Sequence, residues 1–222
     1  ASGITNKSDV WGSNTGTGAG FVPVGNTSTA FTGQLNGNNY VINNLYINAA
    51  QSYVGLFGKA NAATIKNVGV TNLSIFVGNT YNYIGGLVGL AQSSTSISNV
   101  FTTGSIVAGG NTGANQSDSI GGLVGRLTSS SMTNSYNTAS ITVTNRSDAV
   151  GGLVGQAESS SSISNSYNAG NVQVGGGQLI GGLVGALVTS SSVNYAYNLG
   201  SVTNSGSGTA TNTGGFVGLA AN

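Results

Sequence analysis

The sequence predicts an all-β protein: a right-handed β-solenoid (β-helix) of about six coils, with about 30 residues in each coil. Three observations predict this fold. A pair of motifs recurs along the chain, apolar and polar residues alternate with a period of two, and Ser, Asn and Gly crowd the segments between the alternating runs. The 222 residues are enough for one domain with its own core.

The first motif is Ile-Gly-Gly-Leu-Val-Gly at residues 84–89, which returns at 120–125, 150–155 and 180–185 with Val at position 150. Weaker copies end at Gly58 and Gly218. The closing glycines stand at 58, 89, 125, 155, 185 and 218, so the steps are 31, 36, 30, 30 and 33 residues. A fixed period of this kind indicates one structural unit per repeat.

The second motif follows seven or eight residues later and is clearest at residues 163–170, Ile-Ser-Asn-Ser-Tyr-Asn-Ala-Gly. A third short alternating run comes after it, as at 140–143 and 171–174. Each repeat therefore supplies three short strands, and about 30 residues at about 3.3 Å each give a coil perimeter near 100 Å. Coils stacked at about 4.8 Å would contact only their neighbours.

Counting by two along the second motif places three columns of side chains inside the solenoid. The first is apolar: Ile42, Ile65, Ile97, Met132, Ile163 and Val193. The second is Asn44, Asn67, Asn99, Asn134 and Asn165, interrupted by Tyr195, and buried amides there would have to bond to the coils above and below. The third is Tyr46, Gly69, Phe101, Tyr136, Tyr167 and Tyr197, which we expect to stack in the core rather than to form an exposed sugar-binding platform.

The chain is divided into an N-terminal capping segment, residues 1–30, and a repeat array, residues 31–222. We expect Trp11 and Phe21 to close one end of the array. The other end follows the last repeat directly and is expected to be open, as in a piece of a longer protein.

Composition excludes several classes of function. Only 4% of the residues are charged, and the five cations, Lys7, Lys59, Lys66, Arg126 and Arg146, are too scattered to follow a nucleic acid. Without His or Cys, the usual zinc sites, Ser-His-Asp triads, Cys nucleophiles and haem ligands are missing. No apolar run approaches the roughly 20 residues that span a bilayer. We therefore predict no cofactor, no metal, no membrane insertion and no enzymatic activity.

The repeated segments 84–89 and 163–170, together with the lead-in at 31–45, resemble the GLUG repeats of bacterial filamentous-haemagglutinin-like adhesins, over about residues 20 to 220. The resemblance implies a non-catalytic adhesive or structural segment, extracellular or at the cell surface. Its partners would be a glycan or protein on a host or neighbouring cell, or other copies of itself. The alternatives are a carbohydrate-active β-helix, which clustered carboxylates in a groove would favour, and an ice-binding solenoid, which a regular outward Thr grid would favour. An exposed apolar or aromatic stripe would favour adhesion.

Five residues are candidates for a ligand-binding edge: Asp118, Arg146, Asp148, Tyr81 and Tyr83. The two aspartates precede successive Gly-Gly strands, so they would meet one coil apart and either raise a pKa or recruit a cation. The alternative is a pair of solvated loop acids. The links 108–118, 144–148, 175–178 and 203–213 vary in length, and we expect them to form one ragged edge with most of the exposed charge.

Self-association is the last prediction. A period of two sends Leu87 and Val88 to opposite faces, so one of two columns should point outward. One column is Leu56, Leu87, Leu123, Leu153, Leu183 and Phe216, and the other is Phe57, Val88, Val124, Val154, Val184 and Val217. An exposed apolar stripe would be a contact surface, whereas a bulge or covering loop at the flanking glycines would bury both columns.

Overall fold

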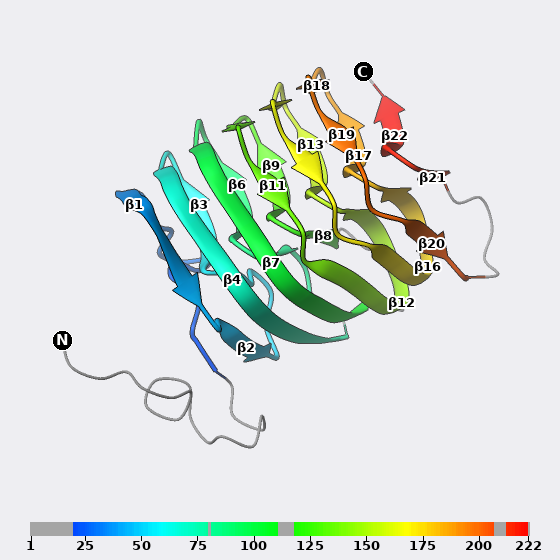
Figure 1. The fold of residues 1–222 in the computed structure, drawn as a ribbon, viewed down its shortest axis with the longest axis horizontal. Helices are drawn as coiled ribbons and strands as arrows, with labels where there is room; N and C mark the ends of the chain where they lie inside the picture. The colour runs from blue at the N-terminus through cyan, green and yellow to red at the C-terminus, as the bar shows by residue number, and fades with distance from the viewer. Residues whose placement is uncertain (1–19, 80, 111–117, 207–211, 222) are drawn as a thin grey trace.

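The structure is a computed structural model that describes residues 20–79, 81–110, 118–206 and 212–221. Within these ranges the chain has no helix and forms a right-handed β-solenoid of six coils, as the repeats predict (Figure 1). Accordingly, no helix of the described chain could span a membrane.

The strands follow the repeats closely. The first coil contains β1 (Gln34–Asn43), β2 (Tyr46–Ala49) and β3 (Phe57–Asn61); the second, β4 (Thr64–Asn79), β5 (Ile84–Gly85) and β6 (Val88–Gln92); the third, β7 (Ser96–Gly110), β8 (Ser119–Gly121) and β9 (Val124–Thr128). The fourth contains β10 (Ser131–Thr133), β11 (Tyr136–Asn137), β12 (Ser140–Gly151) and β13 (Val154–Glu158); the fifth, β14 (Ser162–Ser164), β15 (Tyr167–Asn168), β16 (Val172–Gly181) and β17 (Val184–Val188). The sixth contains β18 (Ser192–Asn194), β19 (Tyr197–Asn198), β20 (Val202–Asn204), β21 (Asn212–Gly214) and β22 (Val217–Ala221).

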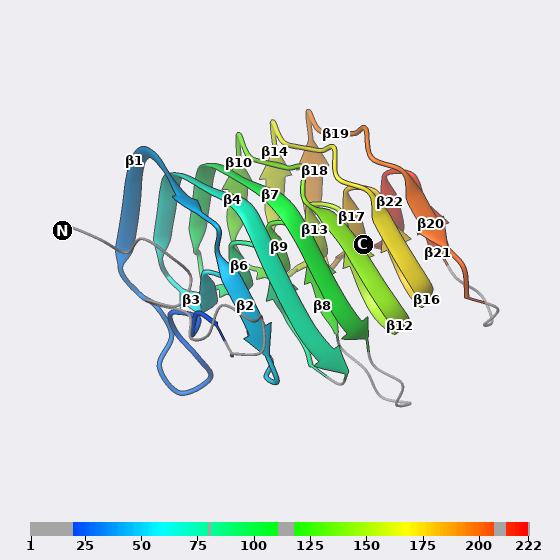
Figure 2. The ribbon, with the colours of Figure 1, turned by 60° about the horizontal axis from the view of Figure 1, so that its bottom comes forward.

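Named strands of successive coils pair in parallel, and equivalent repeat positions lie side by side, for example Ile97, Met132, Ile163 and Val193. We call the face that carries these residues the first face. The second face contains β2, the later parts of β4 and β7, and β12, β16 and β20 (Figure 2). The third face is the six-stranded sheet β3-β6-β9-β13-β17-β22.

The predicted apolar column of the first face is correct from the second coil to the fifth, where Ile65, Ile97, Met132 and Ile163 are buried. It is wrong in the first coil, because Leu35 is the residue that pairs with Ile65. Ile42 pairs with Val70 instead, so the lead-in segment is offset from the register that its sequence suggested.

A left-handed residue breaks the alternation on this face in every coil. From the second coil on, the predicted Asn column has positive φ, at Asn67, Asn99, Asn134, Asn165 and the interrupting Tyr195. Asn44 also has positive φ but follows Asn43, which pairs with Thr71, and in the first coil Asn38 and Asn39 take the left-handed conformation opposite Asn67. Such a residue turns the chain, so the next side chain points inward instead of outward. The prediction of a buried Asn column is therefore wrong. The prediction of an aromatic column in the core is wrong for Phe101, Tyr136, Tyr167 and Tyr197, whereas Tyr46 in the offset first coil is buried. In the fifth coil, Asn165 is exposed, Ser166 and Asn168 are buried, and Tyr167 lies on the outside.

The outward stripe predicted for the first motif is also wrong. Leu87, Leu123, Leu153 and Leu183 are fully buried, and so are the valines that follow them. The glycines explain this, because they let each short strand fold back closely on the next: a Cβ on Gly121 would lie 2.1 Å from the Val124 carbonyl oxygen. Both columns consequently join one core. Phe216 of the last coil is the exception, 39% exposed.

The described part of the capping segment lies against the first coil. Gly20 pairs with Ile47 in antiparallel fashion and Val24 bridges Phe57, while Phe31, the first residue of the repeat array, bridges Ala60. Phe21 packs against the core. Trp11 lies outside the described residues.

Candidate functional site

An aromatic ladder runs along the outer side of the first face. It consists of Phe101, Tyr136, Tyr167 and Tyr197, which occupy equivalent positions in coils three to six. Successive ring centroids lie 5.0, 4.9 and 5.0 Å apart, and the ring planes differ by only 5°, 3° and 1°. The inner rungs are half-buried, and Tyr197 is 50% exposed.

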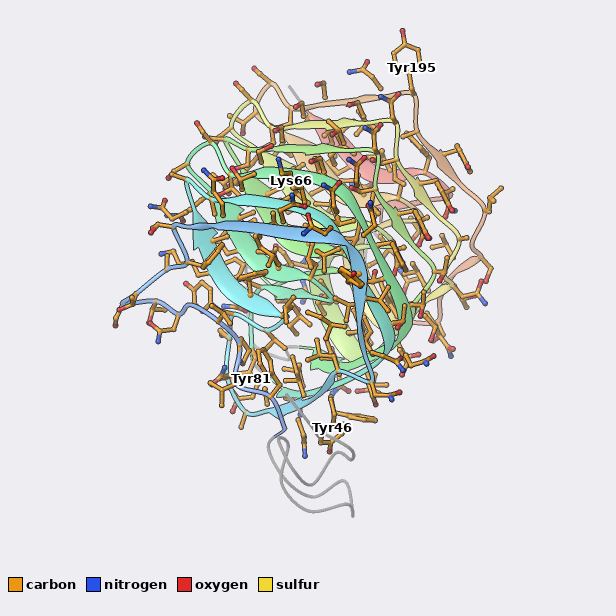
Figure 3. The ribbon with its side chains drawn as sticks, turned by 60° about the vertical axis from the view of Figure 1, so that its left-hand side comes forward. Tyr46, Lys66, Tyr81 and Tyr195 are labelled. Atoms are coloured by element: carbon orange, nitrogen blue, oxygen red, sulfur yellow. The ribbon has the colours of Figure 1, made fainter. Side chains whose placement is uncertain are left out.

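Most ring faces in this ladder are covered. Each inner ring lies between two others, and the Phe101 ring lies over Gly69, where a Cβ would come within 2.3 Å of it. The ladder therefore offers its ring edges to the solvent. The far face of Tyr197 has no further ring stacked on it among the described residues, and Tyr195 (86% exposed) and Leu199 (70%) lie in the same coil. Figure 3 shows Tyr195 projecting away from the rod, on the opposite side from Tyr46 and Tyr81.

Burial raises the pKa of Tyr167, and the neighbouring Tyr136 and Tyr197 raise it further. A negative charge on the central ring is therefore disfavoured by its neighbours as well as by burial. At neutral pH the Tyr167 phenol is therefore uncharged.

Two rows of small polar residues lie beside the ladder, on the strands that precede the left-handed corner. One row is Thr64, Ser96, Ser131, Ser162 and Ser192, and the other is Lys66, Ser98, Thr133, Ser164 and Asn194. The rows are regular, but only Thr64 and Thr133 combine a hydroxyl with a methyl group. Lys66, labelled in Figure 3, is the single charge in the rows.

A buried amide ladder supports the aromatic one from inside. Thr102 donates to Asn137 Oδ1 (2.8 Å), Asn137 Nδ2 donates to Asn168 Oδ1 (2.9 Å), and Asn168 Nδ2 donates to Asn198 Oδ1 (2.8 Å). Each asparagine also closes its own corner, as when Asn168 accepts from the Gly170 N–H and donates to the Gly170 carbonyl oxygen. Buried amides are thus bonded between coils as expected, but they stand three residues after the predicted ones.

Asp118, Arg146 and Asp148 are brought together, as their positions predict. Asp118 Oδ1 accepts a 2.8 Å hydrogen bond from the Asp148 backbone N–H. Asp118 is fully buried, so the alternative of two solvated loop acids is wrong for this residue. Its Oδ2 and the Ser147 hydroxyl are buried without a well-formed hydrogen bond.

The pKa of both aspartates is raised. Burial is the main cause for each, and the charge of Asp118 adds to it at Asp148. The positive charge of Arg146 opposes the rise at both, and the nearby Ser147 hydroxyl opposes it at Asp118. Because Asp118 is inaccessible and already holds a neighbouring strand, the pair is suited to fixing the chain rather than to contacting a substrate.

Tyr83 belongs to a different cluster, on the third face. Its ring lies 5.0 Å from Tyr53 at an angle of 45°, and Arg126 lies 5.7 Å above the Tyr83 ring centre. Arg126 also donates to the Tyr83 hydroxyl (3.2 Å) and holds Glu158 with two hydrogen bonds of 2.9 and 2.6 Å. These contacts lower the pKa of Glu158 even though burial opposes the shift. Tyr81 is half-buried against the core.

The predicted ragged edge is correct in part. Positions 144–148 and 175–178 do lie side by side, with Arg146 opposite Gly176 and Ser147 opposite Gly177. They are not free loops, however, because they belong to the strands β12 and β16, and the length difference is absorbed by a register shift after Val143. Positions 111–117 and 207–211 lie outside the described residues.

Sequence reasoning did not find the aromatic ladder as a surface or the Arg126–Glu158 pair. The signal for the ladder was the asparagine two residues before each of Tyr136 and Tyr167, since Asn adopts the left-handed conformation more readily than most residues. For the ion pair the signal was register, because Arg126 and Glu158 lie two residues apart along the strand direction in adjacent coils.

Comparison with known protein families identifies two of the repeats. Residues 116–144 and 147–173 match the model of the GLUG motif. A stretch of 114 residues is 40% identical to Halomucin of Haloquadratum walsbyi and covers 50% of this chain but only 1% of that protein. No solved structure matches the chain. The chain therefore contains a GLUG-repeat region, which extends through parts of the third, fourth and fifth coils.

Proposed function

We propose that this chain is a non-catalytic adhesive and structural segment of a surface or secreted protein, and that the aromatic ladder is its attachment surface. The partner is an uncharged glycan or a protein on a neighbouring surface, lying along the rod. The proposal rests on the outward position of Phe101, Tyr136, Tyr167 and Tyr197. An aromatic stripe on the surface favours adhesion over a carbohydrate-active β-helix or an ice-binding solenoid.

The chemistry of this surface supports a neutral partner. Ring edges and phenol hydroxyls lie beside two rows of small polar side chains, most of which bear a hydroxyl, and Lys66 is the single cation among the residues of these rows. Such groups offer apolar contact and many neutral hydrogen bonds. Because the inner ring faces are covered, we infer recognition by edges and hydroxyls rather than by a sugar stacked on a ring.

Two further observations argue against the carbohydrate-active alternative. Asp118 is buried and bonded to the backbone of the next coil, so it is poorly placed to exchange a proton with an outside substrate. A cavity of about 450 Å³ lies beside the capping segment, between Val22, Pro23, Gln51 and Tyr53, and none of the described residues that line it carries a carboxylate.

The ice-binding alternative is supported less well by the polar rows. They are regular, but Ser predominates over Thr, so most positions lack the methyl group that the predicted Thr grid would supply. The similarity to a short part of Halomucin supports the view that the segment is one module of a larger extracellular protein.

Binding to a panel of immobilised polysaccharides and matrix proteins tests the proposal. The double variant Tyr136→Ser with Tyr167→Ser should lose binding, while the matched variant Phe76→Ser, which removes an exposed ring from the second face, should keep it. Circular dichroism and thermal unfolding of both variants would separate loss of binding from loss of fold. Equal binding by the folded double variant and the parent would refute the ladder as the attachment surface.

A further inference from the structure

We propose that the ladder is also a site of oxidative cross-linking, at which Tyr136 couples to Tyr167, or Tyr167 to Tyr197, to form dityrosine. The oxidant is hydrogen peroxide used by a haem peroxidase. The inference rests on ladder geometry alone and does not depend on the adhesive function.

Geometry brings the reacting rings together before any oxidation. The rings are one coil apart, nearly parallel and 4.9–5.0 Å between centroids, and parallel strand pairing fixes the spacing of their backbones. Two groups held side by side react as if at very high concentration. The rings are only half-buried or more exposed, so they can exchange electrons with an external oxidant and can tilt toward one another.

Each of two phenols gives up one hydrogen atom, and the two hydrogen atoms reduce one hydrogen peroxide to two waters. The two phenoxyl radicals join through a carbon–carbon bond between the positions next to their oxygens. The hydrogen on each joined carbon then moves to oxygen and restores the aromatic rings, so the protein loses two hydrogens in total per cross-link. Phe101 has no hydroxyl, and the reactive part of the ladder therefore ends at Tyr136.

Tyr53 and Tyr83 provide an internal comparison because their centroids are also 5.0 Å apart. Their rings are tilted by 45°, and Arg126 both lies over the Tyr83 ring and donates to its hydroxyl. A cation in contact with a ring opposes removal of an electron from it. Coupling should therefore favour the ladder over this pair, although the separation is the same.

The masses of tryptic fragments distinguish a cross-link within the ladder from one between Tyr53 and Tyr83. Trypsin cleavage after Lys7, Lys59, Lys66, Arg126 and Arg146 isolates Tyr136 in fragment 127–146 and places Tyr167 and Tyr197 in fragment 147–222. A Tyr136–Tyr167 link joins these two fragments, whereas a Tyr53–Tyr83 link joins fragments 8–59 and 67–126. A Tyr167–Tyr197 link leaves fragment 147–222 lighter by two hydrogens.

The experiment treats dilute full-length chain with peroxidase and hydrogen peroxide, isolates the monomer, and digests it after denaturation. We expect dityrosine fluorescence and the linked 127–146/147–222 fragments, in several-fold higher yield than from chain oxidised in denaturant. Tyr167→Phe keeps the ring but should abolish the ladder links, and Tyr83→Phe should retain them. The proposal is overturned by absence of dityrosine in the monomer, by equal yield from unfolded chain, by predominance of the 8–59/67–126 link, or by an unchanged yield in Tyr167→Phe.

Discussion

Asn165 and Asn168 stand three residues apart in the fifth coil, and the solenoid uses them for opposite purposes. Asn165 is exposed, and its value lies in a backbone with φ of 49°. Asn168 is fully buried, and its value lies in a side chain that bonds to the coils on both sides. The comparison teaches that a repeat column is defined by backbone conformation as well as by residue type.

The largest effect should come from breaking the buried column. Asn168→Ala would remove the acceptor of Asn137 Nδ2 and the donor to the Gly182 carbonyl oxygen, and would leave a void between coils. We expect a loss of about 3–5 kcal/mol in the free energy of unfolding. Chemical denaturation of the parent and the variant measures it, and a change as small as that of an exposed residue would contradict the role assigned to the ladder.

The glycines that face the amide ladder sharpen the same comparison. A Cβ on Gly152 would lie 2.1 Å from the Gly182 carbonyl oxygen and 2.2 Å from Asn168 Nδ2. Gly152→Ala should therefore cost about 3 kcal/mol. At the equivalent residue of the last coil, Gly215, no atom of the described residues lies within 4 Å of such a Cβ, so Gly215→Ala is a matched control with an expected change within about 0.5 kcal/mol. Similar losses in both variants would show that crowding is not the cause.

Exposed Asn165 should respond to backbone preference alone. Asn165→Ala places a residue with a poorer tolerance of positive φ at this corner and should cost about 1 kcal/mol, while Asn165→Gly should be close to neutral. Thermal unfolding of the three proteins provides the test. Equal destabilisation by Ala and Gly would mean that the Asn165 side chain matters in its own right.

A buried carboxylate should behave differently from the buried amides, and pH reveals the difference. The pKa of Asp118 and of Asp148 is raised in the folded chain from the ordinary 3.8, so the folded state holds these protons more tightly than the unfolded state does. Their contribution to stability therefore increases as pH falls from neutral through the folded pKa values toward 3.8. The pKa of Glu158 is lowered in the folded chain, so its contribution to stability is present above its ordinary pKa of 4.5 and is lost as the pH falls through the folded value.

Asp118→Asn isolates this effect, because an amide oxygen can still accept from the Asp148 N–H. We expect the variant to be more stable than the parent at neutral pH and the advantage to shrink on acidification. Urea denaturation at several pH values measures the difference between the two proteins. An advantage that does not depend on pH would argue against ionisation of Asp118 as its origin.

Much of the fold was accessible from the sequence, because register repeats. The six coils, the column Ile65-Ile97-Met132-Ile163 and the meeting of Asp118 with Asp148 all follow from equivalent positions stacking on one another. Counting by two failed wherever the backbone left the extended conformation. The left-handed residue Asn165 reverses which of the following side chains point into the core, so Tyr167 lies at the surface and Asn168 in the core.

The aromatic ladder was harder to predict from the sequence, again because left-handed residues change the direction of the side chains that follow them. The same column of aromatic residues in the sequence is compatible with rings that point into the core or out to the solvent. The backbone conformation of the corner residue before each ring determines which of the two occurs. The fate of Leu123 and Val124 depended on how closely β8 and β9 fold together, a tertiary distance that the glycines permit but do not specify.

The direction of the backbone hydrogen bonds has a mechanical consequence. In the described strands these bonds run from coil to coil, along the rod. A pull between its ends would load them along their own axis and would have to separate only one pair of coils at a time. The rod would then lengthen in steps, and each released coil of about 30 residues would provide about 100 Å of extended chain. Under tension such a segment would act as an extensible tether that yields gradually instead of breaking at once.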